Sequence, residues 1–198
     1  GANAVARSIA KALISRDIPV VLTDTSWENV RAARMDNLRV YYGNPVSEHA
    51  ENNLDLTSIG HMLAISPYKQ LNTLSTYHYL DLMGEGQILG LPEGDQELRA
   101  SHQSASKYVE TRNKFDESAT FAKLASLVSK GASIKITQLS AEFTFETYLK
   151  QHSNRLTLLF AIRPDGQLVP LGRNGEQIPE KDWELISLIQ PEESLTSE

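Results

Sequence analysis

Two hydrophobic periods alternate along the first ninety residues. Apolar positions spaced three and four apart indicate amphipathic helices, and these are predicted at residues 4–15, 26–34, 46–54 and 70–83. Short apolar runs between them predict strands at residues 20–24, 38–42, 61–66 and 87–91. Strands and helices that alternate through short loops are typical of a parallel sheet with helices on both faces. The first unit, residues 1–92, is therefore predicted to be a doubly wound α/β domain.

The start of this unit departs from the usual pattern. Gly1, Ala2 and Asn3 directly precede the first helix, at the place where a doubly wound sheet has its first, central strand. We therefore expect that strand to be missing and the sheet to have a gap beside residues 20–24. An unpaired strand edge of this kind invites pairing from another chain.

A second, smaller unit follows a polar stretch. Residues 93–114 are rich in Ser, Glu and Gln and are interpreted as a linker, residues 115–190 as a small α+β domain, and residues 191–198 as a disordered tail. The elements expected in the α+β domain are a helix at 116–130 with Asp116 as N-cap, a strand at 133–139, a short helix at 143–151, a hairpin of 156–162 and 167–171 around a turn at 163–166, and a last strand at 183–189.

Composition excludes several classes of protein. The chain has 19 Lys and Arg against 25 Asp and Glu, a net charge of −6, so a general nucleic-acid surface is not expected. It has no cysteine, which excludes disulfides and thiolate chemistry, and its five histidines show no metal-ligand spacing. No signal peptide and no apolar run long enough to cross a bilayer is present. We expect a soluble, cytosolic protein with no metal.

Candidate chemistry gathers in the loops that follow the predicted strands, because such loops meet at one edge of a parallel sheet. The segment from Gly1 to Ala6 has the spacing of a G-x-G-x-x-G phosphate loop, with Asn3 and Ala6 at its second and third glycines. The helix that starts there offers free N–H groups to a phosphate. Asp24 follows about twenty residues later, where dinucleotide folds place a carboxylate for the ribose hydroxyls. An acidic residue there favours a ribose with an unphosphorylated 2′-hydroxyl. The alternative is a purely structural role, in which Asp24 only caps the helix at Ser26.

Two further loops are weaker candidates. Asn44 and Pro45 follow the second predicted strand, where Asn44 is either a partner for an adenine edge or a turn residue. Ser66 closes the strand at 61–66, and Asn72 lies in the first turn of the helix after it. Each of these polar residues is also a plausible helix cap.

Taken together, these segments resemble one known family. Residues 1–10, residues 20–30, the Val-Tyr-Tyr-Gly-Asn-Pro run at 40–45 and Gln70-Leu71-Asn72 are similar to the RCK/KTN (TrkA-N-like) nucleotide-binding regulatory domains of potassium channels and monovalent cation/proton antiporters. The resemblance covers most of residues 1–92, and residues 115–190 resemble an RCK-C-like ligand module. Residues 24–29 and the second unit are most similar to the cytosolic tail of bacterial sodium/proton antiporters. The resemblance implies a Rossmann-like fold for the first unit.

The resemblance also implies the site residues. Phosphate contacts would come from Ala2, Asn3 and Ala4 with Gly1 shaping the loop. Ribose contacts would come from Asp24 and Thr25, and adenine contacts from near Asn44 and Pro45, with Ser66 facing the cleft. The sequence departs from the family at Asn3 and Ala6, which replace glycines, and at Asn44, where the family usually has Asp. The implied ligand is NAD(H) or another adenine nucleotide (AMP, ADP or ATP).

The implied role is regulation of ion transport rather than catalysis. In the family a membrane transport domain precedes such a tail, which would lie on the cytoplasmic side of the inner membrane and pair as a homodimer. A candidate pairing stripe on the helix at 70–83 consists of Leu71, Leu74, Tyr77 and Leu80, unless this stripe faces its own sheet. Two alternatives stay open: a free-standing NAD-dependent oxidoreductase, and an interaction module that needs no ligand.

Overall fold

The computed structural model describes residues 1–92, 115–172 and 177–192. The linker expected at 93–114 and most of the tail expected at 191–198 therefore lie outside the described residues. The helices are α1 (Ala4–Ile14), α2 (Trp27–Met35), α3 (Glu48–Asn53), α4 (Lys69–Met83), α6 (Phe121–Ser129) and α7 (Phe145–His152), with short 3-10 turns at Glu85–Gln87 and Ser153–Arg155. The strands are β1 (Leu22–Asp24), β2 (Val40–Tyr42), β3 (Met62–Ala64), β4 (Ile88–Gly90), β5 (Ser133–Gln138), β6 (Leu156–Ile162), β7 (Leu168–Pro170) and β8 (Glu184–Ile189).

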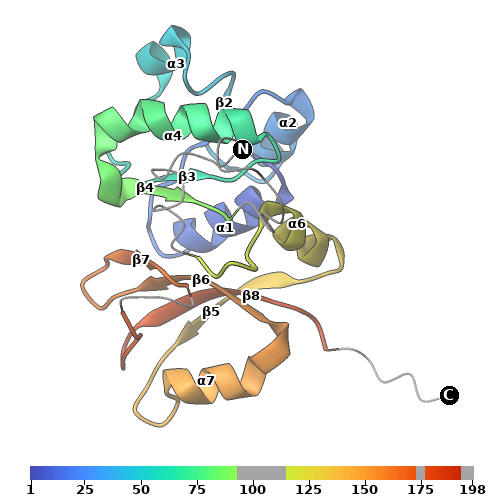
Figure 1. The fold of residues 1–198 in the computed structure, drawn as a ribbon, viewed down its shortest axis with the longest axis vertical. Coiled ribbons are helices and arrows are strands. Elements are labelled where there is room, and N and C mark those ends of the chain that lie inside the picture. Colours follow the sequence, from blue (N-terminus) through green and yellow to red (C-terminus); the bar gives the residue numbers. More distant parts are fainter. Residues whose placement is uncertain (93–114, 173–176, 193–198) are drawn as a thin grey trace, which may run out of the picture.

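The first unit is an α/β domain whose sheet is split. Strand β1 pairs in parallel with β2, and β3 pairs in parallel with β4, but the two pairs are not joined to each other. Figure 1 shows α4 on one side of β3 and β4 and α1 on the other. Both the α/β class and the gap beside β1 are confirmed, because the central position of the sheet is unfilled.

Local sequence signals explain where the elements begin. Ser26 caps α2 as expected, since its side chain accepts a hydrogen bond from the Asn29 amide. The expected helix at 116–130 starts later than predicted. The Asp116 side chain accepts a hydrogen bond of 2.9 Å from the Ser118 amide and so forms a turn. Thr120 is the residue that caps α6. An Asp that can bond the backbone two residues on makes such a turn as readily as a cap.

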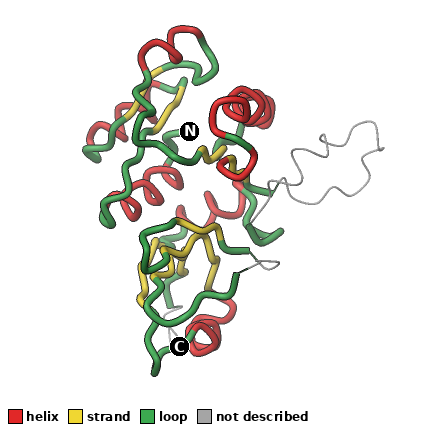
Figure 2. Tube along the Cα trace, turned by 90° about the vertical axis from the view of Figure 1, so that its left-hand side faces the viewer, coloured by secondary structure: helices red, strands yellow, loops and turns green. Residues whose placement is uncertain are grey.

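The second unit is a four-stranded sheet in the order β5-β8-β6-β7, antiparallel throughout. Its hairpin turns at Gly166, which has φ +84° and donates its amide to the Arg163 carbonyl at 2.8 Å. Successive residues of β8 face opposite sides, so Leu185 packs beside Tyr148 of α7 while Ile186 packs toward α1. Figure 1 and Figure 2 show α7 on the far side of this sheet from the first unit.

Helix α1 is shared by both units. Its buried residues belong to one apolar core that also contains Leu124 of α6, Phe160 of β6 and Ile186 of β8. It contacts β1 on one side and α6 and β5 on the other. At its C-terminal end, Arg16 Nε lies 2.7 Å from Glu184 Oε2 of β8. The core is therefore continuous from the split sheet to the four-stranded sheet. Among the described residues, no helix is long and apolar enough to cross a membrane.

This shared core predicts that the two units unfold together. Ile9 is 3% exposed in the middle of α1, so Ile9→Ala should lower the free energy of unfolding by about 2–5 kcal/mol. The chain offers one tryptophan in each unit, Trp27 and Trp183, and single-tryptophan variants can follow each unit separately in urea. We expect both signals to shift to the same lower midpoint.

Met35→Ala is the matched control, because Met35 is 79% exposed on α2 and its truncation should leave the midpoint unchanged. A shift of the Trp27 transition with an unmoved Trp183 transition would contradict the shared core.

Candidate functional site

Residues 1–3 bridge the two halves of the split sheet. The Ala2 amide donates to Asp24 Oδ2 at the end of β1, at 2.7 Å. On the other side, Asn3 Nδ2 donates to the Ile65 carbonyl just after β3, at 2.8 Å. The loop that starts α1 is thereby fixed at the carboxyl ends of both strands, the edge at which open α/β sheets bind ligands.

Only glycine fits at position 1 of this bridge, because there is no room for a side chain. A Cβ built on Gly1 would lie 2.5 Å from the Ile65 carbonyl oxygen and 2.8 Å from Asn3 Nδ2. The first of these contacts is with backbone, which cannot move aside as a flexible side chain can. The glycine expected from the loop spacing is thus needed because the chain passes directly against the residue that follows β3.

Asp24 is 8% exposed and is held by three donors. Its Oδ2 accepts from Ala2 and from Asn29 Nδ2 at 3.0 Å, and its Oδ1 accepts from the Ser26 amide at 2.8 Å. A carboxylate offers about four acceptor positions, so one remains on Oδ1 for a ligand hydroxyl. A ribose diol that used both oxygens would have to displace the Asn29 side chain. Asp24 thus closes the turn before α2 and keeps limited capacity for a ligand.

The start of α1 has a defined cap and unused donors. Asn3 Oδ1 accepts the Ala6 amide at 3.1 Å, which makes Asn3 the N-cap of the helix. Within the described residues, no protein acceptor is recorded for the amides of Ala4 and Val5. These amides and the positive end of the helix dipole suit an anion. The amide of Ala2 is engaged by Asp24, so a phosphate contact there would require that bond to open.

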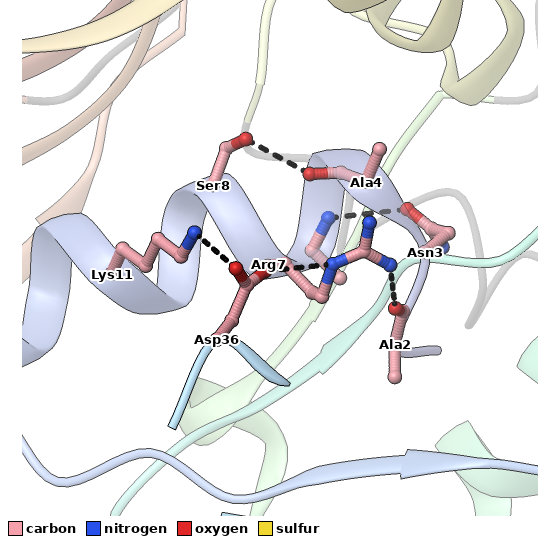
Figure 3. Close-up of polar contacts among 8 residues, drawn as sticks. Ala2, Asn3, Ala4, Arg7, Ser8, Lys11 and Asp36 are labelled. Carbon is pink, nitrogen blue, oxygen red and sulfur yellow. Dashed lines mark hydrogen bonds and ion pairs between the residues drawn. The ribbon is translucent and has the colours of Figure 1, made fainter. Parts of the chain in front are cut away.

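Arg7 fixes the same loop and shares Asp36 with Lys11 (Figure 3). Arg7 donates from Nη1 to the Ala2 carbonyl at 2.8 Å and from Nε to Asp36 Oδ2 at 3.1 Å. Lys11 Nζ lies 2.7 Å from Asp36 Oδ1. The hydrogen bond from Lys11, followed by the charges of both cations, holds the pKa of Asp36 below its ordinary value. The network ties α1 to the C-terminal end of α2.

A cavity of about 620 Å³ opens beside this loop. Its volume lies within the range of small-molecule sites, which are mostly apolar with a few placed polar groups. The polar residues at its loop end include Asn3, Asp24, Thr25, Asn29 and Ser66. The remaining walls are mainly apolar and come from α1, α4, the two strands that flank the gap, the loop after α3 and residues of the second unit such as Phe121 and Phe160. The donor set fits the sugar and phosphate part of a nucleotide at one end of the cavity.

The second predicted loop is only partly at the cavity. Pro45 is buried and lines it, and its carbonyl accepts the Tyr79 hydroxyl at 2.9 Å. Burial is the main cause that raises the pKa of Tyr79 above its ordinary value. The hydroxyl therefore remains a hydrogen-bond donor at neutral pH. Asn44 is exposed and is not among the cavity residues. Its side chain accepts the Val46 amide at 3.1 Å, which is the turn alternative considered for it.

Ser66 lies at the cavity and is joined to α4. Its Oγ donates to Asn72 Oδ1 at 2.6 Å, and Asn72 Nδ2 donates to the Ser66 carbonyl at 2.9 Å. Both side chains line the cavity. Six of the predicted site residues therefore line one cavity: Gly1, Asn3, Asp24, Thr25, Pro45 and Ser66. The other three do not line it. Ala2 is hydrogen-bonded to Asp24, Ala4 is exposed at the start of the helix, and Asn44 lies in an exposed turn.

Sequence reasoning missed three residues that shape this site. Asn29 restrains the Asp24 carboxylate, Arg7 restrains the Ala2 carbonyl and Tyr79 restrains Pro45. Only Asn29 had a visible signal, as a polar residue in the first turn of α2 directly after the acidic loop. Arg7 and Tyr79 reach their partners across 5 and 34 residues through the folded packing, which no local pattern reveals.

Comparison with known proteins gives one family match and a likeness to solved structures. Residues 1–106 match one protein family, described as the TrkA-N domain. Among solved structures, the chain is similar to one titled the crystal structure of the GsuK RCK domain, with 12% sequence identity and a TM-score of 0.29. That alignment covers 89% of this chain and 44% of the other, so the chain spans less than half of that relative's length. No curated protein matches the chain.

The Asp36 network predicts a pH-dependent contribution to stability. Because folding lowers the pKa of Asp36, its stabilisation is present above the ordinary value of 3.8 and is lost as the pH falls through the lower folded value. Asp36→Asn should therefore destabilise the protein at pH 7 by less than about 1 kcal/mol, since the pair is partly exposed. The difference from the unmodified protein should vanish in acid, as measured by urea unfolding across pH.

Asp17→Asn serves as the matched control, because Asp17 lies in the loop after α1 at φ +57°, a conformation that Asn also adopts. A destabilisation by Asp36→Asn that persists unchanged at pH 2 would show that the effect is not electrostatic.

Proposed function

The chain belongs to the TrkA-N domain family, and on that premise we propose that it is the nucleotide-sensing regulatory part of a monovalent cation/proton antiporter of the sodium/hydrogen exchanger kind. TrkA-N domains in general bind nucleotides of the NAD(H) type. In this proposal the chain is joined to a membrane transport domain and works on its cytoplasmic side. It binds an adenine nucleotide and passes the binding energy to the transporter as a conformational bias.

One observation carries the proposal. The Asp24 carboxylate, the bridge at residues 1–3 and the N-terminal end of α1 lie together at a cavity of about 620 Å³. A sugar hydroxyl would use the remaining acceptor position of Asp24, and phosphates would use the amides of Ala4 and Val5. Thr25 and Asn3 would border the ligand, while Gly1 keeps the loop close to Ile65.

The position of α1 supports regulation. The helix begins at the proposed phosphate contacts and ends at Ile14, two residues before Arg16, which pairs with Glu184 of the four-stranded sheet. A small shift of the helix on binding would therefore reach the second unit without any intermediate segment. A nucleotide that binds one arrangement better than another shifts that equilibrium by its differential affinity, which is all that such a sensor requires.

Binding without turnover is part of the proposal. Among the described residues, no group of three potential metal ligands occurs, and the polar side chains at the cavity are mostly engaged with one another. The alternative of an NAD-dependent oxidoreductase predicts consumption of NADH with small carbonyl compounds. The alternative of a ligand-free interaction module predicts no nucleotide binding at all.

We expect calorimetry to detect binding of at least one of NAD, NADH, AMP, ADP and ATP, with no turnover of NADH. NADP should bind at least about tenfold more weakly than NAD, because its 2′-phosphate would meet the Asp24 charge. Asp24→Asn keeps the shape of the side chain and an acceptor for Ala2 but removes the charge. This variant should bind NAD more weakly, and the difference in affinity between NAD and NADP should become smaller.

Asp55→Asn is the matched control, because Asp55 is an exposed carboxylate in the loop after α3 that is not among the cavity residues. It should leave both affinities unchanged, and the thermal midpoint of each variant shows that it is folded. Equal affinity of the unmodified chain for NAD and NADP would show that Asp24 is not the ribose contact. Absence of binding to all five nucleotides would overturn the proposed function.

A homodimer is proposed through α4. Leu74 and Tyr77 are exposed on this helix, Leu71 and Leu80 are half-buried, and Leu82 is exposed near its end. The residues that α4 buries are instead Ser75, Thr76 and Tyr79. Two of the four residues of the stripe, Leu74 and Tyr77, are therefore exposed and available to a pairing surface.

The proposed dimer predicts a concentration-dependent mass in sedimentation equilibrium. Leu74→Glu should convert a dimer to a monomer, because it would bury a charge in the contact. Gln70→Glu adds the same charge at an exposed position one turn earlier and should have a much smaller effect. A monomer at high micromolar concentration of the unmodified chain would contradict pairing.

A further inference from the structure

One face of α2 combines exposed apolar side chains with positive charge. Arg31, Arg34 and Met35 lie four, seven and eight residues after Trp27, which places all four side chains on the same face of the helix. All four are exposed, Trp27 at 52% and Met35 at 79%. Tyr42 of β2 adjoins Trp27 and is 51% exposed. These five residues are called the α2 patch below.

The aromatic part of the α2 patch is ordered by its own contacts. The rings of Trp27 and Tyr42 form an edge-to-face pair with their centroids 5.5 Å apart. The guanidinium carbon of Arg34 lies 5.2 Å from the centroid of the Trp27 ring, within the range of a cation–π contact. Trp27 is therefore held in place while half of it remains in contact with water. Little side-chain freedom is left for it to lose when a partner binds.

The charge of the α2 patch is opposite to that of the whole chain. The chain carries a net charge of −6, whereas the patch contributes two cations, Arg31 and Arg34. Within α2 the one acidic residue is Glu28. The Asp36 carboxylate just beyond the helix is already paired with two cations of α1. The patch is therefore a local positive region on an acidic protein, and an anionic partner is complementary to it.

The α2 patch faces away from the candidate nucleotide site. On the other side of the helix, Val30 and Ala33 are buried and Asn29 donates to Asp24. None of the five patch residues lines the cavity of about 620 Å³. Figure 1 shows α2 at the outer edge of the first unit, away from the four-stranded sheet. The patch is thus a surface separate from the site described above.

We propose that the α2 patch docks on the headgroup layer of an anionic phospholipid bilayer. Trp and Tyr rings favour this layer, because each has an apolar body and a polar edge. Arginine guanidinium groups pair with phosphate oxygens through two hydrogen bonds, and their stems lie along apolar surface. The side chains of the patch therefore match both the charge and the mixed polarity of such a surface.

The docking is weak and reversible. Each Arg near an anionic membrane contributes about fivefold in affinity, and the patch has two. In the proposed function the chain is joined to a membrane domain, so the docking would set which face of the first unit lies toward the bilayer. The docking itself does not depend on that function, because no residue of the patch lines the nucleotide cavity.

A second copy of this chain is a poorer occupant. A two-fold contact through the α2 patch would bring Arg31 and Arg34 of both copies together, and like charges at a contact are unfavourable. The patch has five residues, whereas a stable protein interface takes roughly 20–30 residues from each side.

An acidic protein would match the charge but not the shape. Trp27 and Met35 protrude from an exposed helix face, so a protein partner would need a preformed pocket for each of them. Lipid headgroups instead rearrange around protruding side chains. The lipid surface is therefore the occupant that the patch favours.

Cosedimentation of the full chain with vesicles tests the docking. Binding to vesicles of equal parts phosphatidylcholine and phosphatidylglycerol should be at least about tenfold stronger than binding to phosphatidylcholine vesicles, and it should weaken at high salt. Tryptophan emission should shift to shorter wavelength and should be quenched by lipids brominated on their acyl chains. Both signals should be absent from Trp27→Phe, whose remaining tryptophan, Trp183, is buried.

Two double variants remove the same charge at different places. Arg31→Gln with Arg34→Gln should lower the affinity for the anionic vesicles at least about tenfold. Lys130→Gln with Lys150→Gln removes two exposed cations from the second unit and should have a much smaller effect. The thermal midpoint of each double variant shows that it is folded.

Each other result would overturn the docking. The proposal fails if the chain does not bind the anionic vesicles at millimolar lipid and low salt, or if both double variants lose the same affinity. Binding to soluble polyglutamate as strong as to the vesicles, with no shift of Trp27 emission, would favour an acidic protein. A concentration-dependent shift of Trp27 emission without vesicles would favour a second copy. Nucleotide affinity is measured separately, so a failure here is distinct from a failure of the proposed function.

Discussion

The rest of the first unit depends on the bridge made by residues 1–3. Two hydrogen bonds of 2.7 and 2.8 Å, one to Asp24 and one to the Ile65 carbonyl, connect strand pairs that share no ladder with each other. The bridge works because Gly1 has no side chain to strike the Ile65 carbonyl. The same three residues start α1 and border the cavity. The proposed ligand contacts and the integrity of the split sheet therefore rest on one short segment.

This arrangement gives Asp24 two roles that compete for the same atoms. As a structural residue it orders the start of α2 and the Ala2 amide, and as a ligand contact it would need its oxygens free. The energetic consequence is that a nucleotide must offer bonds at least as good as those it displaces, since unpaired buried donors are costly. A ligand that displaces Asn29 also loosens the start of α2. In the proposed function, occupancy of the cavity would therefore be coupled to the conformation of this loop.

Much of the fold could be predicted from local pattern. The alternation of helices and short strands, the Ser26 cap and the hairpin turn ending at Gly166 are all encoded within a few residues, and all are confirmed. The start of α6 could not be fixed this way, because Asp116 and Thr120 both suit a cap and only packing decides between them. The buried face of α4 was also hidden. The fully buried residues of this helix are Ser75, Thr76 and Tyr79, which the hydrophobic pattern does not single out because two of them are polar.

The site was predictable to the extent that it lies in strand-end loops. Asp24, Ser66 and Pro45 reach the cavity because such loops meet at one edge of a parallel sheet, whereas Asn44 forms a local turn. Of the partners that restrain these residues, only Asn29 had a signal in the sequence, because the contact of Tyr79 with Pro45 depends on tertiary packing.

The shared helix α1 also constrains how this chain can evolve. Its positions must satisfy neighbours from the beginning of the chain and from segments more than a hundred residues later, among them Leu124 and Ile186. A substitution in α1 that packs well against the first unit must also pack well against the four-stranded sheet. The C-terminal half therefore cannot be exchanged for that of a relative as an independent module. A working chimera would have to carry α1 together with the C-terminal half.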